Sequence, residues 1–170
     1  MLGPDQLPKE LVFIRARKKF TVNVAIAAKR VLHFYDEPED KSPLHYKCHW
    51  EVRLGQLIPG NGDCWWTLPG EPSYLPVLAE VKELVVGRAV PIVKEHLTEE
   101  RLLELWDQNV GGFEYPTLKY KSILLGERGR FEELPAIFER IREICRGGLA
   151  QAGAEQHIAQ VRQRFCLKVQ

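Results

Sequence analysis

Residues 47–68 read Lys-Cys-His-Trp-Glu-Val-Arg-Leu-Gly-Gln-Leu-Ile-Pro-Gly-Asn-Gly-Asp-Cys-Trp-Trp-Thr-Leu, and this stretch joins two differently patterned halves of the chain. In its first part every second side chain is apolar, which is typical of a half-buried strand. Residues 59–63 break the pattern, because glycine and asparagine adopt backbone angles that strands and helices do not use. Two adjacent tryptophans, Trp65 and Trp66, follow in a chain that has only four. The stretch therefore predicts a strand, a turn and an aromatic segment.

Strand patterns dominate the chain before this stretch. Apolar side chains recur at every second position in residues 20–28, and residues 11–17 form a shorter apolar segment that ends in basic residues. We expect these two segments to pair as a hairpin, and we expect residues 48–54 to join the same antiparallel sheet. Residues 31–35 are expected to extend the apolar strand past a bulge. Residues 36–43 are acidic and contain two prolines, which indicates an exposed loop.

Helical spacing dominates after residue 73. Ser73 is expected to cap the first helix, and Pro91 predicts a kink or a break in it, because proline removes a hydrogen bond and collides with the preceding turn. Thr98 is the expected cap of the next helix. Residues 116–145 predict a helical hairpin linked at residues 126–129, and residues 154–165 predict a last amphipathic helix. The second helix of the hairpin has a clear apolar face, formed by Leu134, Ile137, Phe138, Ile141 and Cys145.

Strands followed by helices predict an α+β fold, in which an antiparallel sheet from the N-terminal half is covered by helices from the C-terminal half. A length of 170 residues fits a single domain over residues 1–170. We expect the sheet in about residues 10–68 and the helices in about residues 73–166.

The composition is that of a globular protein, with 45% hydrophobic and 28% charged residues. The net charge of +1 creates no strong field that would attract nucleic acid or an anionic membrane. No apolar run reaches the roughly 20 residues that span a bilayer. The first residues lack the basic and apolar regions of a signal peptide. We therefore expect a cytoplasmic protein with neither a nucleic-acid nor a membrane partner.

The cysteines and histidines offer one metal candidate. His45, Cys48, His49 and Cys64 have the sulfur and imidazole ligands that zinc prefers. Neighbouring residues on a strand point to opposite faces, however, so Cys48 and His49 would not reach one ion. Cys64 is a poor candidate nucleophile, because the adjacent Asp63 disfavours the thiolate. We accordingly expect four reduced thiols, no metal and no cofactor.

Other catalytic motifs are weak. The acidic pairs at residues 99–100 and 132–133 lie at expected helix starts, where they favour the helix dipole. No phosphate-binding loop follows a strand, and no Ser/His/Asp order suggests a hydrolase. The basic cluster at residues 15–19 is interpreted as a solvated hairpin turn. The sequence leans away from an enzyme without deciding the question.

The central stretch resembles a known family. Cys-His-x-x-x-Arg-Leu-Gly-Gln-Leu-Ile at residues 48–58, a short turn, and Trp-Trp-x-Leu at residues 65–68 are similar to a largely bacterial family catalogued as domain of unknown function DUF4304. Residues 20–26 resemble its Asn-containing strand, and residues 118–138 resemble its closing helical hairpin, so the likeness covers roughly residues 10–145. The resemblance implies the fold and contributes little on function.

Members of that family usually begin with an amphipathic helix and a short strand. Only some ten residues precede Leu11 here, so we expect this first helix to be missing. A sheet face without its covering helix would expose apolar area, and large exposed apolar patches mark partner sites. This departure from the family pattern favours a homodimer.

Five residues of the central stretch form the candidate binding surface. In one interpretation, Trp50 and one of the paired tryptophans lie in the core, and Arg53 forms an ion pair with Glu51 or Asp63. In the other, the second tryptophan and Arg53 face a partner, since both residue types are enriched at binding hot spots. The candidate residues are His49, Glu51, Arg53, Trp65 and Trp66.

Two functions of different classes follow. The first is a non-catalytic protein-binding module, of which a bacterial immunity or accessory protein would be an example. The second is a small-molecule-binding domain or enzyme with a pocket between sheet and helices, lined by Trp50, Trp65 and Arg53. The sequence specifies neither a substrate nor a partner.

Overall fold

The computed structural model describes residues 11–16, 19–36, 48–60, 62–68, 74–108 and 113–167. Four features expected from the sequence lie outside these ranges. They are the segment before Leu11, where a family helix was expected to be missing, most of the 36–43 loop, His45 and the Ser73 cap.

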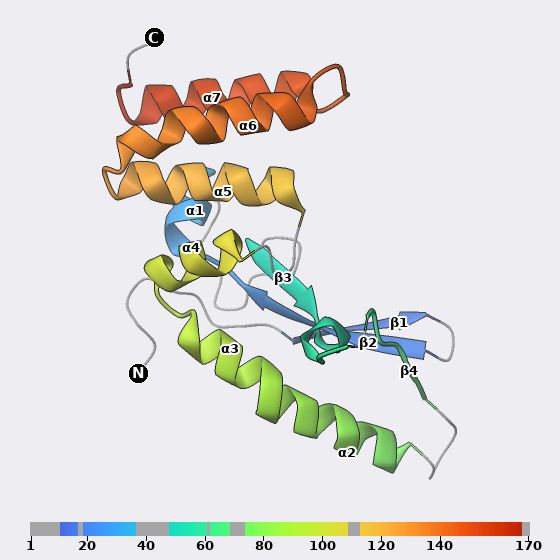
Figure 1. The fold of residues 1–170 in the computed structure, drawn as a ribbon. Helices are drawn as coiled ribbons and strands as arrows, with labels where there is room; N and C mark the ends of the chain where they lie inside the picture. The colour runs from blue at the N-terminus through green and yellow to red at the C-terminus, as the bar shows by residue number, and fades with distance from the viewer. Residues whose placement is uncertain are drawn as a thin grey trace.

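The strand β2 (Lys19–Ile26) is the centre of an antiparallel sheet. β1 (Leu11–Ala16) pairs with one of its edges. β3 (Trp50–Arg53) and the two-residue β4 (Trp66–Thr67) pair with the other edge (Figure 1). The expected hairpin and third strand are thus confirmed. β3 ends at Arg53 because a 3-10 turn (Leu54–Leu57) begins at the next residue.

Both faces of β2 are buried. Phe20, Val22, Val24 and Ile26 belong to the main hydrophobic core, together with side chains from the helices. The opposite face carries Thr21 and Asn23, which are 0% and 3% exposed. The hydroxyl of Thr21 and the amide nitrogen of Asn23 both donate hydrogen bonds, which offsets part of the cost of their burial.

Residues 31–35 do not extend the sheet, and the expected strand continuation is wrong. Residues 31–34 belong to α1 (Lys29–Phe34), and Tyr35 caps its C-terminus. Two bonds to the carbonyl of Ala28 close the first turn, from the N–H groups of Val31 and Leu32 at 3.1 and 3.2 Å. Val31 and Leu32 are both buried. This segment packs against α5, and that contact selects the helix, so packing overrides the β-propensity of these residues.

One long helix follows the sheet. It consists of α2 (Leu75–Leu84), a π-turn (Val85–Ala89) and α3 (Val90–Glu95), and Figure 1 shows it running along the lower edge of the molecule. The kink expected near Pro91 appears as this π-turn, which has i→i+5 bonding. Apolar residues recur here at every fourth position, and in a regular α-helix such a row drifts by about 40° per step. The π-turn counteracts the drift and keeps one row facing the core, formed by Val77, Val81, Val85, Ala89 and Val93.

Four more α-helices follow among the described residues, and together with the sheet they confirm the α+β class. Thr98 caps α4 (Glu99–Asp107) as expected, since its hydroxyl accepts from the N–H of Arg101 at 3.3 Å. α5 (Glu114–Glu127) and α6 (Leu134–Cys145) form the expected hairpin, and α7 (Gln151–Arg164) packs on α6. In Figure 1, α5 lies between α1 and α4 on one side and α6 and α7 on the other. Its residues 123–125 are accordingly all fully buried.

The link between α5 and α6 lies later in the chain than expected, at residues 128–133, and it includes a 3-10 turn (Phe131–Glu133). Gly126 lies inside α5, where its missing side chain leaves room for the ring of Phe165. Gly129 makes the turn with a φ of +72°, a backbone conformation that other residues rarely adopt. In the part of the chain that the structure describes, no helix has both the length and the apolar character needed to cross a membrane.

Candidate functional site

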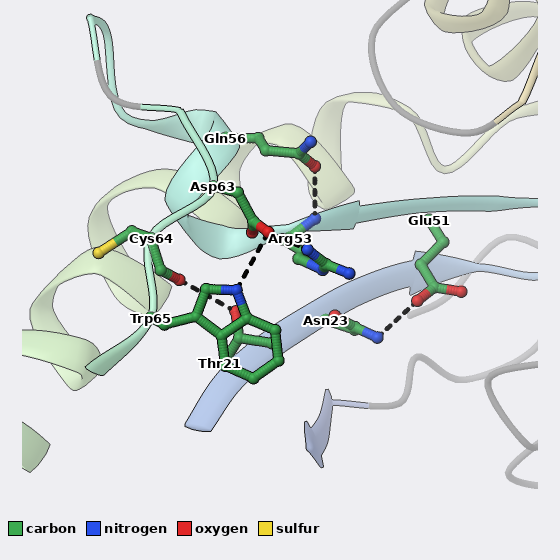
Figure 2. A network of polar contacts seen from close by, with 8 residues as sticks. All are labelled: Thr21, Asn23, Glu51, Arg53, Gln56, Asp63, Cys64 and Trp65. Carbon is green, nitrogen blue, oxygen red and sulfur yellow. Dashed lines mark hydrogen bonds and ion pairs between the residues drawn. The ribbon is translucent and has the colours of Figure 1, made fainter. Parts of the chain in front are cut away.

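Arg53, Asp63 and Trp65 meet at the end of β3, and we call these three residues the Arg53–Trp65 surface. The guanidinium carbon of Arg53 lies 5.3 Å from the centre of the Trp65 ring, within cation–π range. Asp63 Oδ2 joins the two, because it pairs with the guanidinium and also accepts the indole N–H of Trp65 at 3.0 Å. Figure 2 shows both contacts converging on this carboxylate. The side chains of Arg53 and Asp63 remain 42% and 37% exposed.

The chain reaches this arrangement through a tight turn. The N–H of Arg53 donates to the side-chain oxygen of Gln56 at 3.0 Å, which caps the 3-10 turn after β3. Gly55 then passes so close to Cys64 that a Cβ at Gly55 would lie 2.4 Å from the Cβ of Cys64. This close approach holds the segment that carries Asp63 and Trp65 against the end of β3.

A polar layer on β2 and β3 lies beside the surface (Figure 2). Asn23 and Arg53 are direct cross-strand partners, and the amide of Asn23 donates to the carboxylate of Glu51 at 2.5 Å. The hydroxyl of Thr21 donates to the carbonyl of Cys64 at 3.3 Å. Within the described residues, the buried amide oxygen of Asn23 accepts no hydrogen bond. The carboxylate of Glu51 is therefore engaged by the neighbouring strand β2.

His49 is not on the surface, which corrects the expectation from strand alternation. It precedes β3, is 7% exposed, and its Nδ1 accepts the backbone N–H of Ala28 at 2.8 Å. The ring of Tyr120 packs edge-on against it at 4.7 Å. Burial lowers the pKa of His49 from 6.5 to about 3. A neutral imidazole that accepts from the backbone is a structural group.

Trp66 also leaves the expected surface. It is 5% exposed, packs 6.0 Å from the ring of Phe20, and donates its indole N–H to Glu80 at 3.1 Å. Adjacent residues on an extended segment point to opposite sides, so only Trp65 remains partly exposed. The core position that the sequence left open between the two tryptophans thus belongs to Trp66. The partner of Arg53 is Asp63 rather than Glu51.

Trp50 lies apart from the Arg53–Trp65 surface. It is 2% exposed, belongs to the main core, and occupies the opposite face of β3 from Arg53. Trp50 therefore does not line a common pocket with Arg53 and Trp65 between sheet and helices.

The thiol of Cys64 is the nearest candidate nucleophile. Burial raises its pKa, and the negative charges of Glu80 and Asp63 raise it further. The neutral thiol is favoured, and a thiol is a weak nucleophile compared with a thiolate.

Comparison with known families concerns the first half of the chain. Residues 15–95 match a family described as domain of unknown function (DUF4304). The match confirms the resemblance carried by residues 20–26 and 48–68, while the α5–α6 hairpin lies beyond it. No curated protein and no solved structure matches the chain.

The Arg53–Trp65 surface lies inside the DUF4304 match. A second cluster of polar side chains connects the matched region to the later helices. His157 of α7 is 2% exposed and lies between two hydroxyls, with Nδ1 at 3.2 Å from Tyr35 and Nε2 at 2.9 Å from Ser122. Ser122 donates its proton to the carbonyl of Lys119 at 2.7 Å, so it accepts from Nε2. This direction is opposite to that needed to activate a serine nucleophile.

Sequence reasoning missed the His157 network because its members are far apart in the chain. Burial, with a smaller contribution from the charge of Lys119, lowers the pKa of His157 to about 4. No sequence pattern links Tyr35, Ser122 and His157. Among the described residues of this DUF4304-like chain, no three Asp, Glu, His or Cys side chains come together as metal ligands would.

Proposed function

We propose that this chain is a non-catalytic protein-binding module that contacts its partner through the Arg53–Trp65 surface. The observation that carries this proposal is the stacked pair itself, held by one shared carboxylate oxygen and still partly exposed. Tryptophan and arginine are the residue types most enriched at binding hot spots.

Preorganisation supports the proposal. Long side chains lose conformational freedom when a partner immobilises them, which opposes binding. Arg53 and Trp65 are already ordered by Asp63, and the approach of Gly55 to Cys64 fixes the segment behind them. A partner therefore meets a surface whose geometry is set before contact.

The chemistry of the surface defines the partner. A guanidinium has five N–H donors, and Asp63 occupies only part of them. The remaining donors suit a carboxylate or a backbone carbonyl, and the indole of Trp65 suits an apolar or aromatic side chain. We infer a protein segment that combines an acceptor with an adjacent apolar residue.

Affinity capture from a lysate of the source organism tests this proposal. The wild-type bait is compared with an Arg53→Ala/Trp65→Ala variant and with a matched control, Arg146→Ala/Leu149→Ala. The side chains of Arg146 and Leu149 are exposed between α6 and α7. The purified partner is then titrated calorimetrically against all three. We expect the first variant to weaken binding by about 30-fold or more and the control to leave it unchanged.

Two outcomes would contradict the proposal. One is a partner that binds the Arg53→Ala/Trp65→Ala variant as tightly as the wild type. The other is a wild-type bait that enriches no protein over this variant. Circular dichroism of each bait verifies that the loss of binding is not a loss of fold.

A further inference from the structure

The long helix of α2, the π-turn and α3 carries a second apolar row next to the one that faces the core. Its members are exposed rather than buried, and we call them the outer row. They are Leu75, Leu78, Val86 and Val90, with 60%, 40%, 60% and 36% of their surface exposed. Exposed apolar side chains gathered along one element mark an interaction surface.

The π-turn aligns this row. Val86 and Val90 follow Leu78 by two and three steps of four residues, and each step would rotate a regular α-helix by about 40°. The N–H of Val90 bonds instead to the carbonyl of Val85, five residues back. This wider turn opposes the rotation and leaves the outer row straight, as it does for the core-facing row.

The order of residues in the row is self-complementary. If two copies of the helix pair antiparallel about an axis between Lys82 and Glu83, Leu75 of one copy faces Val90 of the other. Leu78 then faces Gly87, and Ala79 faces Val86. Leu78 and Val86 thus each meet a small residue, as ridges meet grooves in packed helices, while Leu75 and Val90 meet each other at the ends of the contact. A two-fold contact requires this kind of self-complementary surface.

Charge fits the same pairing. Lys82 and Glu83 are exposed, and neither forms an ion pair within the described residues. Across the proposed axis, Lys82 of each copy faces Glu83 of the other. The arrangement therefore places two attractive pairs at the centre of an otherwise apolar contact.

We propose that the outer row is the contact between two copies of this chain, paired as antiparallel helices about a two-fold axis between Lys82 and Glu83. The contact uses a different element from the Arg53–Trp65 surface and does not depend on its function. A single helix about 30 Å long buries less than the roughly 800 Å² per partner of a standard interface. The dimer is therefore reversible and depends on concentration.

Sedimentation equilibrium over a wide concentration series tests the dimer, and Gly87→Gln tests its geometry. A Cβ at Gly87 meets nothing within 4 Å, so the monomer accommodates the new side chain. In the dimer that side chain would collide with Leu78 of the second copy. We expect the dimer Kd to rise at least about tenfold. Gly62→Gln is the matched control, because Gly62 is equally open and lies far along the chain from the helix.

Charge exchange tests the axis. Lys82→Glu alone and Glu83→Lys alone place like charges across the axis, and each should weaken the dimer by several-fold. The double variant restores opposite charges and should return Kd to within about threefold of the wild type.

A wild-type protein that stays monomeric throughout the series overturns the proposal. So does a dimer that is unaffected by Gly87→Gln, or a double charge variant that dimerises as weakly as either single variant. Thermal unfolding of the dilute variants shows that the monomer fold is unchanged.

Discussion

Ser122 and His157 are joined by a buried hydrogen bond of 2.9 Å in which the imidazole Nε2 donates and the hydroxyl accepts. Both residues are buried, at 0% and 2% exposure, so water does not replace a lost partner. The contact fastens α7 to α5 and, through Tyr35, to the segment that follows α1.

Replacement of Ser122 by alanine removes the acceptor for this N–H. We expect the free energy of unfolding to fall by about 1–3 kcal/mol, which is the usual cost of leaving a buried donor unsatisfied. Urea denaturation measures the change. Thr117→Ala on the same helix is the control for helix propensity, since its side chain is only half buried. Equal losses in the two variants would show that the buried hydrogen bond contributes nothing.

Stability should depend on pH through His49 and His157. Burial lowers their pKa values from 6.5 to about 3 and about 4, so between those values and 6.5 the unfolded chain binds more protons than the folded one. The contribution of these histidines to the free energy of unfolding is therefore fully present above about pH 6.5. It falls as pH decreases, by up to about 1.4 kcal/mol per pH unit for each histidine.

Urea denaturation at a series of pH values measures that slope. His157→Gln should make it shallower than that of the wild type, because one of the two buried histidines is then absent. The slope is compared rather than the absolute stability, because this variant also loses hydrogen bonds. A His157→Gln slope identical to that of the wild type would contradict this prediction.

Replacement of Gly55 by alanine should destabilise the turn behind the Arg53–Trp65 surface. The new methyl group would lie 2.4 Å from the Cβ of Cys64 and 2.5 Å from its backbone nitrogen, and a backbone atom does not move aside as a flexible side chain would. Overpacking of this kind costs about 1–3 kcal/mol. Chemical denaturation of Gly55→Ala and Gly62→Ala provides the comparison, and similar stabilities would show that the turn opens at little cost.

The thiols should react in a defined order. Burial and two nearby carboxylates raise the pKa of Cys64, which lowers its thiolate fraction, whereas Cys166 is exposed and Cys145 is buried. Alkylation at mildly alkaline pH, followed by peptide mass spectrometry, should modify Cys166 first and Cys64 later. Faster labelling of Cys64 would indicate an activated thiol and would count against a purely binding role for the surface.

Local sequence patterns were sufficient to predict an element where a single periodicity extended through the whole segment. Alternation in residues 20–28 predicted β2, and the spacing of Leu134 to Cys145 predicted the buried face of α6. The Thr98 cap followed from its hydroxyl and the acids after it. These features depend on contacts between near neighbours in the chain, so the sequence around them is enough.

Residues 31–35 show where this approach fails. Their apolar character suits a strand or a helix, and the choice depends on what they pack against. Docking beside α5 selects α1, a contact between segments far apart in sequence. The candidate surface was limited in the same way, because alternation placed His49 outside without knowledge of the Ala28 N–H that draws it inward.

The sequence by itself determined that strands precede helices, that a turn at residues 59–63 leads to paired tryptophans, and that the first half resembles DUF4304. Only the tertiary structure decided that Trp65 rather than Trp66 joins Arg53, and that Tyr35, Ser122 and His157 form one network. The reason is physical: side-chain periodicity is a local property, whereas burial and hydrogen-bond partners are set by segments that meet only after the chain has folded.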